Sequence, residues 1–352
     1  MKRKYLSMVL CLFSIGLATI CFVLFGVNPT GAELWPHERT PSVSKEDAYL
    51  PDYLPFAQRV DPEIDRKMRS LEWRNVGPFM GNRGTGVEMH PTKKNVFYHA
   101  HSSGGVWKTK DAGQYWFPIT DGQINVGSVG AIAVSQSNPD TIYIGTGEPQ
   151  LRDCVSWGDG AYKTTDGGKT WKHIGLKNTR HISRIRIHPE NPSLVYVAAI
   201  GNPFGPSKDR GVYRSKDGGK TWEQILFKHE QAGVIDLVMC DHDPTILYAS
   251  TFEVLRRTWG LKAGGPNSGI FKSTDGGDTW KEITRNPGLP SDNLGRIGLA
   301  HSKDMPNRIS ALIDSKEKNG LYQSEDGGET WNWISDHIGI IQRPFYYYHL
   351  HA

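Results

Sequence analysis

Cysteine is scarce in this chain of 352 residues, which contains four. Two of them, Cys11 and Cys21, lie in an apolar run near the N-terminus. Cys154 and Cys240 remain, too few for a fold held together by disulfides. We therefore predict that these two thiols are unpaired.

The chain also lacks a large excess of either charge. It carries 41 basic and 37 acidic residues, a formal net charge of +4. Residues 1–32 contribute three basic residues and no acidic ones, so the remainder carries only +1. A general nucleic-acid binder needs a strongly basic surface, and this balance argues against nucleic acid as a partner.

One long apolar run is present, over residues 5–27, directly after Lys2, Arg3 and Lys4. A basic start followed by an apolar run is typical of an export signal, and Ala32 ends a stretch suited to cleavage. The run is also long enough to span a bilayer. We expect residues 1–32 to be a signal peptide or an uncleaved membrane anchor. The protein would then be exported, as a periplasmic or extracellular protein or one tethered at the cell surface through residues 5–27.

Residues 33–70 are predicted to be a linker with a short helix. The first part of this segment carries proline, serine and charge with little hydrophobic periodicity. Asp61, Pro62 and Glu63 then resemble the start of a helix that ends near Ser70.

A phrase of eight residues occurs five times after the linker: Thr or Ser, any residue, Asp, a small residue, Gly, two residues and Trp. The spacings between successive Asp residues are 55, 51, 58 and 51 residues, which indicates a repeat architecture. The positions are Asp111, Asp166, Asp217, Asp275 and Asp326.

Each repeat supplies four short segments rich in β-branched and aromatic residues, bounded by turn-forming residues. The third segment reads Gly, apolar, aromatic, polar, as in residues 105–108 and 160–163. Four strands in about 50 residues make one propeller blade. The sequence thus predicts an all-β fold, a β-propeller of four-stranded blades over residues 71–352, with five repeats and an incomplete sixth blade.

The Asp motif is predicted to form the turn between the third and fourth strands. Its glycines permit positive φ, its carboxylate can accept hydrogen bonds from turn amides, and its Thr or Ser hydroxyl can close the loop. A catalytic group is not needed five times at equivalent positions, so we assign these Asp residues a structural role.

The two ends of the repeat region do not make whole repeats. Residues 72–77 resemble a fourth strand with no preceding partners, and residues 343–352 resemble the first strand of a further blade. Truncation of a longer propeller explains both. In the alternative, a five-bladed propeller, the last residues pair with the N-terminal strand.

The repeated motif over residues 71–352 resembles the Asp-box, or BNR, repeat. Such repeats occur in sialidases, sortilin-type receptor domains, xyloglucan-active endoglucanases and large exported bacterial proteins. The resemblance implies a propeller but does not fix an activity. The Arg-Ile-Pro signature of sialidases is absent. In the resemblance to the xyloglucan-active family, Ser102 stands where a catalytic Asp would be, and Ser cannot act as an acid or base there.

Blade topology places the loops between second and third strands on one face, together with the connections between repeats. We call this the loop face, and the opposite one, which carries the Asp motifs, the turn face. Long second-to-third loops are expected at residues 148–159, 201–210 and 252–268. Arginine with exposed aromatic residues is typical of a recognition surface. The candidate binding residues are Arg83, Glu148, Arg152, Trp157, Arg180, His181, Arg256, Trp259 and Arg296.

The sequence favours an exported binding module for a glycan or a peptide or protein ligand, resembling sortilin-type domains. The alternative is a glycoside hydrolase whose acids come from Glu148, Asp153 or Asp159. For any single arginine, an ion pair between blades is the competing interpretation. No cofactor is predicted. No metal is predicted either, because the two histidine pairs, His99 with His101 and His349 with His351, lack a third ligand in the sequence. Arg184 and Asp236 are expected to pair across the channel.

Overall fold

The computed structural model describes residues 63, 83–152 and 154–351. All of these except Glu63 belong to one compact unit. The predictions for residues 1–32 and for the strand at 72–77 therefore lie outside the described residues. Of the predicted linker at 33–70, only Glu63 is described. In the part that is described, no helix is long and apolar enough to cross a membrane.

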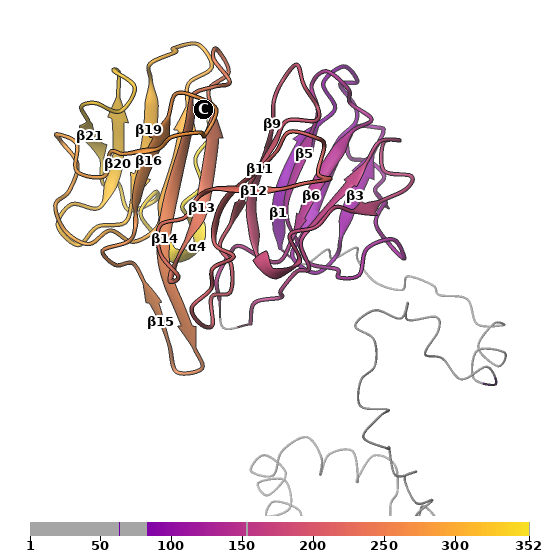
Figure 1. Ribbon diagram of the computed structural model, residues 1–352, viewed down its shortest axis with the longest axis horizontal. Helices are drawn as coiled ribbons and strands as arrows, with labels where there is room; N and C mark the ends of the chain where they lie inside the picture. Colours follow the sequence, from indigo (N-terminus) through magenta and orange to yellow (C-terminus); the bar gives the residue numbers. More distant parts are fainter. Residues whose placement is uncertain (1–62, 64–82, 153, 352) are drawn as a thin grey trace, which may run out of the picture. The chain divides into compact units, whose positions relative to one another are not determined.

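Five antiparallel sheets follow one another along the chain, each built from consecutive strands (Figure 1). The first sheet contains β1 (Gly84–Met89), β2 (Phe97–His101), β3 (Val106–Thr109) and β4 (Phe117–Pro118). The second contains β5 (Val129–Val134), β6 (Ile142–Thr146), β7 (Ala161–Thr164) and β8 (Lys172–His173). The third contains β9 (Ile182–Ile187), β10 (Val195–Ala199), β11 (Gly211–Ser215) and β12 (Glu223–Leu226), after a short 3₁₀ helix η2 (Lys177–Thr179).

The last two sheets repeat this order. The fourth contains β13 (Ala232–Met239), β14 (Leu247–Arg257), β16 (Gly269–Ser273) and β17 (Lys281–Glu282), with β15 (Gly260–Ala263) beside β14. The fifth contains β18 (Ile297–His301), β19 (Ile309–Ile313), β20 (Gly320–Ser324) and β21 (Asn332–Ser335), and a short helix α4 (Pro344–Tyr347) follows it. The predicted all-β propeller with four strands per repeat is confirmed.

The first strands of successive sheets pack side by side: β1 against β5, β5 against β9, β9 against β13, and β13 against β18. The apolar cores lie between neighbouring sheets. Tyr98 and Val106 of the first sheet, for example, share one cluster with Ile132 and Ile144 of the second. Equivalent clusters fill the next three junctions. Burial between sheets, which is the main stabilising term, therefore joins each blade to its neighbours.

The Asp motifs form the predicted turns and are structural. In the second repeat, the Thr164 hydroxyl donates to Asp166 Oδ1 at 2.6 Å and accepts the backbone N–H of Gly168 at 3.1 Å. The other oxygen of Asp166 accepts the Thr170 hydroxyl at 2.6 Å. These hydrogen bonds to the charged form lower the pKa of Asp166. Gly168 has φ of 94°, a conformation that favours glycine.

Three predictions concern details of this fold. Cys154 and Cys240 are free thiols, as predicted. The segment 252–268, predicted as a loop, instead extends β14 and returns as β15, because Val254 and Leu255 pair with Ala263 and Lys262. The predicted strand at 343–352 is also wrong, since Pro344–Tyr347 is helical and proline provides no N–H for a ladder.

Candidate functional site

Arg83 and Glu148 form an ion pair on the loop face. Arg83 precedes β1 and Glu148 follows β6, so the contact joins the first two sheets. Arg83 Nε donates to Glu148 Oε1 at 2.8 Å, and Nη2 lies 2.6 Å from the same oxygen. The Glu148 side chain is fully buried, and burial raises its pKa although Arg83 acts in the opposite direction. Its second oxygen, Oε2, has no hydrogen-bond partner among the described residues.

His181 lies beside this ion pair and contacts the backbone of Glu148. It precedes β9, and its Nδ1 lies 2.9 Å from the backbone oxygen of Glu148. Burial lowers the pKa of His181 to about 4, so the ring is neutral and donates from Nδ1. Its Nε2 is then an acceptor, and it is buried without a partner in the described structure. The structure thus brings together Arg83, Glu148 and His181, three of the predicted binding residues.

A cavity of about 650 Å³ opens on the same face, between the first three sheets. Its walls include Ser102, Trp157 and Phe204. Trp157 is 57% exposed and Phe204 is 40% exposed, whereas Ser102 is buried, with its hydroxyl unpartnered in the described residues. The remaining lining residues are Ser103, Val126, Gly127, Ser128, Val155 and Ser156.

Arg180 fixes the tryptophan of this cavity. Its guanidinium carbon lies 4.5 Å from the centre of the Trp157 ring, within the range of a cation–π contact. The backbone of the two loops is also joined, since Gly158 donates its N–H to the carbonyl of Arg180 at 2.6 Å. Arg180 therefore orients the ring and leaves more than half of it exposed. Arg152, in the same loop, instead contacts Tyr346, whose hydroxyl raises the pKa of the guanidinium through a hydrogen bond.

The other predicted residues lie elsewhere. Arg256 belongs to β14, and Trp259 lies at the turn between β14 and β15, 85% exposed. Neither lines the cavity. In Figure 1, β15 and the adjoining end of β14 extend beyond the neighbouring strands. Of the predicted binding residues, the structure therefore brings together only those of the first three sheets.

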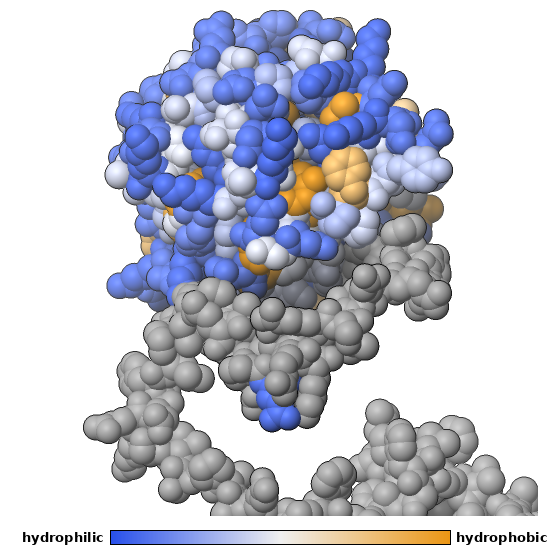
Figure 2. Space-filling model, turned by 90° about the vertical axis from the view of Figure 1, so that its right-hand side faces the viewer, coloured by the Kyte–Doolittle hydropathy of each residue, from blue (hydrophilic) through white to orange (hydrophobic). Residues whose placement is uncertain are grey.

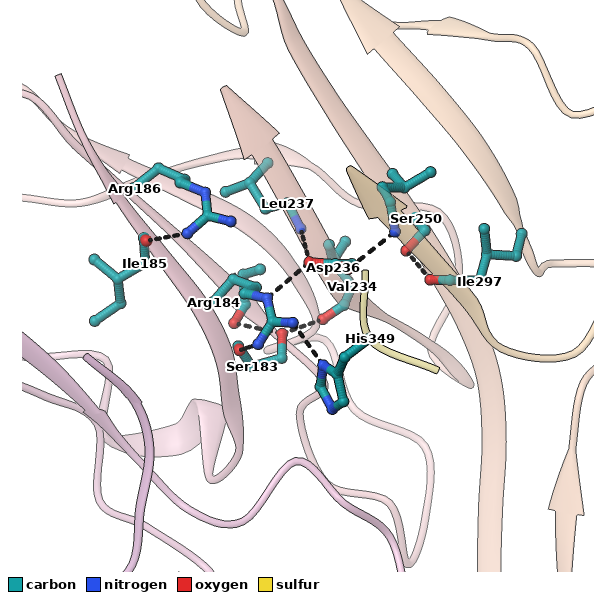
Figure 3. Close-up of polar contacts among 12 residues, drawn as sticks. Ser183, Arg184, Ile185, Arg186, Val234, Asp236, Leu237, Ser250, Ile297 and His349 are labelled. Carbon is teal, nitrogen blue, oxygen red and sulfur yellow. Dashed lines mark hydrogen bonds and ion pairs between the residues drawn. The ribbon is translucent and has the colours of Figure 1, made fainter. Parts of the chain in front are cut away.

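Arg296 is buried in the channel between the first strands of the sheets. It donates to the carbonyl oxygens of Phe345 and Tyr346, at 3.2 Å each. The predicted pair of Arg184 and Asp236 is also present, with Nε 2.8 Å from Oδ1 (Figure 3). Asp236 accepts in addition the backbone N–H of Leu299 at 3.0 Å, so this carboxylate links β9, β13 and β18.

Glu88 and Arg186 are channel residues that were not predicted from the sequence. Glu88 lies on β1 and Arg186 on β9, and both line a second cavity. One signal was available: residues 182–187 read Ile-Ser-Arg-Ile-Arg-Ile, and alternate residues of a strand share a face. Two arginines on the first strand of a blade indicate a charged channel wall. Within residues 83–152 and 154–351, no three side chains of His, Cys, Asp or Glu are grouped to hold a metal ion.

One side of the propeller, the right-hand side in Figure 1, has a mainly hydrophilic surface. Figure 2 shows this side of the propeller, on which hydrophobic residues form small separate patches among hydrophilic ones. Isolated patches of this kind are ordinary for a protein surface. On the loop face, the cavity with its exposed aromatic walls is the feature that needs a functional explanation.

Two family models match parts of the chain. The Sortilin-Vps10 model (sortilin, neurotensin receptor 3) matches residues 210–345, and the BNR/Asp-box repeat model matches residues 162–173. A curated xyloglucanase, Xgh74A of Acetivibrio thermocellus, is 24% identical over 78% of this chain and 34% of its own length. A xyloglucanase of Paenibacillus sp is 26% identical, over 64% of this chain and 23% of its own length. The chain thus spans about a third, or less, of the length of these relatives.

Two solved structures have similar folds. An ancestral GH74 enzyme superposes with a TM-score of 0.56 at 20% identity, over 76% of this chain and 33% of that one. The GH74 enzyme of Niastella koreensis superposes with a TM-score of 0.53 at 18% identity, over 71% of this chain and 38% of that one. Identities this low establish the fold alone. Together with the five Asp motifs and five sheets, these matches identify the chain as an Asp-box (BNR) repeat β-propeller.

Proposed function

We propose that this chain is part of a polysaccharide-active protein of the glycoside hydrolase type, and that the cavity on the loop face binds a sugar of its substrate. The similarity to xyloglucanases favours this alternative over the sortilin-like binding module that the sequence analysis preferred. The Sortilin-Vps10 match begins at residue 210, after all residues that line the cavity.

The cavity is the observation that carries this proposal. Its volume of about 650 Å³ falls in the range of small-ligand sites, roughly 300–1,000 Å³. Trp157 and Phe204 offer flat apolar surfaces, and Ser102 and Ser128 offer hydroxyl groups. Flat rings beside hydrogen-bonding groups suit a pyranose, which has apolar C–H faces and hydroxyls around its rim. We infer that the substrate class is a neutral β-glucan such as xyloglucan.

The carboxylates of this face limit the chemistry that the chain can perform. Hydrolysis of a glycosidic bond needs two carboxyl groups. Glu148 has a raised pKa and an Oε2 without a hydrogen-bond partner among the described residues, which suit a general acid, and it lies outside the lining of the cavity. Asp159 is engaged by three neighbours, because it accepts from Asn125, Tyr162 and Thr146. Asp153 lies outside the described residues. Glu148 is accordingly the residue to which we assign the acid role, if this chain supplies one.

Binding is tested first, with the full chain and xyloglucan oligosaccharides in isothermal titration calorimetry. Trp157→Ala and Phe204→Ala are expected to weaken binding by about tenfold or more, as truncation of central aromatic contacts usually does. Trp259→Ala is the matched control, because this ring is more exposed but lies outside the cavity. Equal affinity in wild type and in both cavity variants would place the sugar elsewhere.

Turnover is tested separately by release of reducing ends from xyloglucan. Glu148→Gln keeps the size of the side chain and removes the transferable proton, so a wild-type rate should disappear while binding persists. A variant rate equal to that of wild type would remove Glu148 from the mechanism. Binding without any turnover would leave the chain with a glycan-binding role alone.

A further inference from the structure

Three guanidinium groups lie in the central channel. Arg184 and Arg186 lie on β9, and Arg296 directly precedes β18. Arg184 pairs with Asp236, whereas Arg186 donates to the carbonyl oxygen of Ile185 at 3.3 Å (Figure 3). In the described part of the chain, the partners of Arg296 are two carbonyl oxygens and the ring of His349. The acidic groups that act on Arg186 are Asp236, Glu88 and Asp241, and burial raises the pKa of Glu88 to about 7.

His349 is a poor match for the position that it occupies between two of these groups. Arg184 Nη2 lies 2.6 Å from its Nδ1, and Arg296 Nη2 lies 2.9 Å from its Nε2. A guanidinium only donates, and a neutral imidazole has a single acceptor nitrogen. One of the two contacts therefore brings two N–H groups together. Protonation of the ring would remove the remaining acceptor, and burial beside the two arginines lowers the pKa of His349 well below its usual value.

An oxyanion would satisfy both arginines at this position. Its oxygens are acceptors only, and the two oxygens of a carboxylate are about as far apart as the two nitrogens of an imidazole. Each guanidinium could then make a charge-assisted hydrogen bond, which is stronger than a neutral one. Asp236 does not fill this role, because its oxygens already accept from Arg184, Leu237 and Leu299.

The channel has room for such a ligand next to His349. A cavity of about 540 Å³ is lined by Arg184, Arg186, Gln150, His349 and His351, among others. The buried Oε1 of Gln150 has no partner among the described residues, but this oxygen is an acceptor and cannot bond to an oxyanion. Glu88 also lines this cavity. The cavity thus places the guanidinium groups of Arg184 and Arg186 next to the ring of His349.

We propose that the channel is a binding site for a small molecule carrying an oxyanion, held between Arg184 and Arg296 at the position that His349 fills. The shared chemistry is a pair of oxygens bearing negative charge, as in the carboxylate of a sugar acid or in a sugar phosphate. This site is separate from the cavity at Trp157 and does not depend on the function proposed for that cavity.

The test uses the full chain and three probes built on one ring: glucuronate, glucose 6-phosphate and glucose. Binding is measured by calorimetry and by the shift in melting temperature. At least one anionic probe is expected to bind and glucose is not. Binding of glucuronate alone would assign the site to carboxylates, and binding of glucose 6-phosphate alone would assign it to phosphate esters.

Two variants locate the site. His349→Ala vacates the position between the arginines and is expected to strengthen anion binding. Arg296→Gln is expected to weaken it by about tenfold or more, the usual effect of losing a hydrogen bond to a charged group. Arg257→Gln, an exposed arginine of β14, is the control for general charge effects. If Arg296→Gln does not fold, Arg296→Lys takes its place, because it keeps the charge but not the fork of donors.

The proposal is overturned if neither anion binds to the wild-type protein, and binding to His349→Ala alone would mean that the substitution has created the site. The proposal is also overturned if the Arg296 variant that folds binds the anion as well as wild type does. Trp157→Ala should weaken sugar binding but leave anion binding unchanged, because Trp157 does not line the channel cavity. The two proposals can therefore fail independently of each other.

Discussion

Lys108 of the first sheet donates its Nζ to the carbonyl oxygen of Gly167, in the Asp motif of the second sheet, at 2.9 Å. The polar residue that ends each Gly-apolar-aromatic-polar segment thus bonds to the Asp motif of the next sheet. The same relationship recurs at Lys163 with Gly218, Arg214 with Gly276 and Lys272 with Gly327. In the fifth repeat the position is Gln323, whose amide lies 3.5 Å from the Ser310 hydroxyl.

Lys272→Met should lower the free energy of unfolding by about 1–2 kcal/mol, since the hydrogen bond joins a charged donor to a partly buried carbonyl. Urea unfolding measures the change. Lys281→Met serves as the control, because Lys281 and its partner Glu329 are more than half exposed and such pairs contribute about 0–1 kcal/mol. An equal loss of unfolding free energy in both variants would show that the hydrogen bond from Lys272 to Gly327 contributes no more than an exposed ion pair.

Thr164→Val tests the Asp motif without changing any charge. Valine has nearly the shape of threonine, but it leaves the buried N–H of Gly168 without its acceptor. We expect a loss of about 1–3 kcal/mol in unfolding free energy, the cost of an unsatisfied buried donor. The loop face is remote from this turn, so sugar and anion binding by the folded protein should not change. Wild-type stability in this variant would contradict the role assigned to the motif.

Arg83→Met should destabilise the protein by about 3–5 kcal/mol, because it leaves the buried carboxylate of Glu148 unpaired. The double variant Arg83→Met with Glu148→Gln removes that charge and should regain part of the loss. A double-mutant cycle in urea unfolding measures the coupling. Additive losses would mean that the two residues act independently.

Glu88→Gln should stabilise the protein more at pH 8 than at pH 5. Burial raises the pKa of Glu88 from 4.5 to about 7, with Arg186 and Arg184 acting in the opposite direction. Between these values the folded state holds a proton that the unfolded state releases, so wild-type stability falls as pH rises from about 4.5 to above 7. Melting temperatures across this range check the prediction. The same pH dependence in wild type and variant would assign the proton to another group.

The repeated parts of the fold could be predicted because each signal occurs five times. Turn residues such as Gly168 and Asp166 act locally, so their sequence alone indicates the turn they make. The predicted strands and the two faces depend on this regular blade geometry, whereas the contact of Arg83 with Glu148 was found only in the structure.

Features that occur once could not be predicted in this way. The hairpin of β14 and β15 pairs residues that have no equivalent in the other repeats. The segment around His349 is positioned by Arg184 and Arg296, which are 165 and 53 residues away in the sequence. A contact at such separation leaves no local pattern, and β propensity alone wrongly favoured a strand there.

The position of the apolar clusters between sheets has a consequence for synthesis of the chain. A single blade released from the ribosome has its apolar side uncovered until the following blade emerges. Successive Asp motifs are 51 to 58 residues apart, so burial of each blade lags its own synthesis by about that length. Exposed apolar surface on a growing chain favours aggregation and chaperone binding. The smallest fragment that can fold on the ribosome is therefore a pair of neighbouring blades, and each further blade folds onto the one before it.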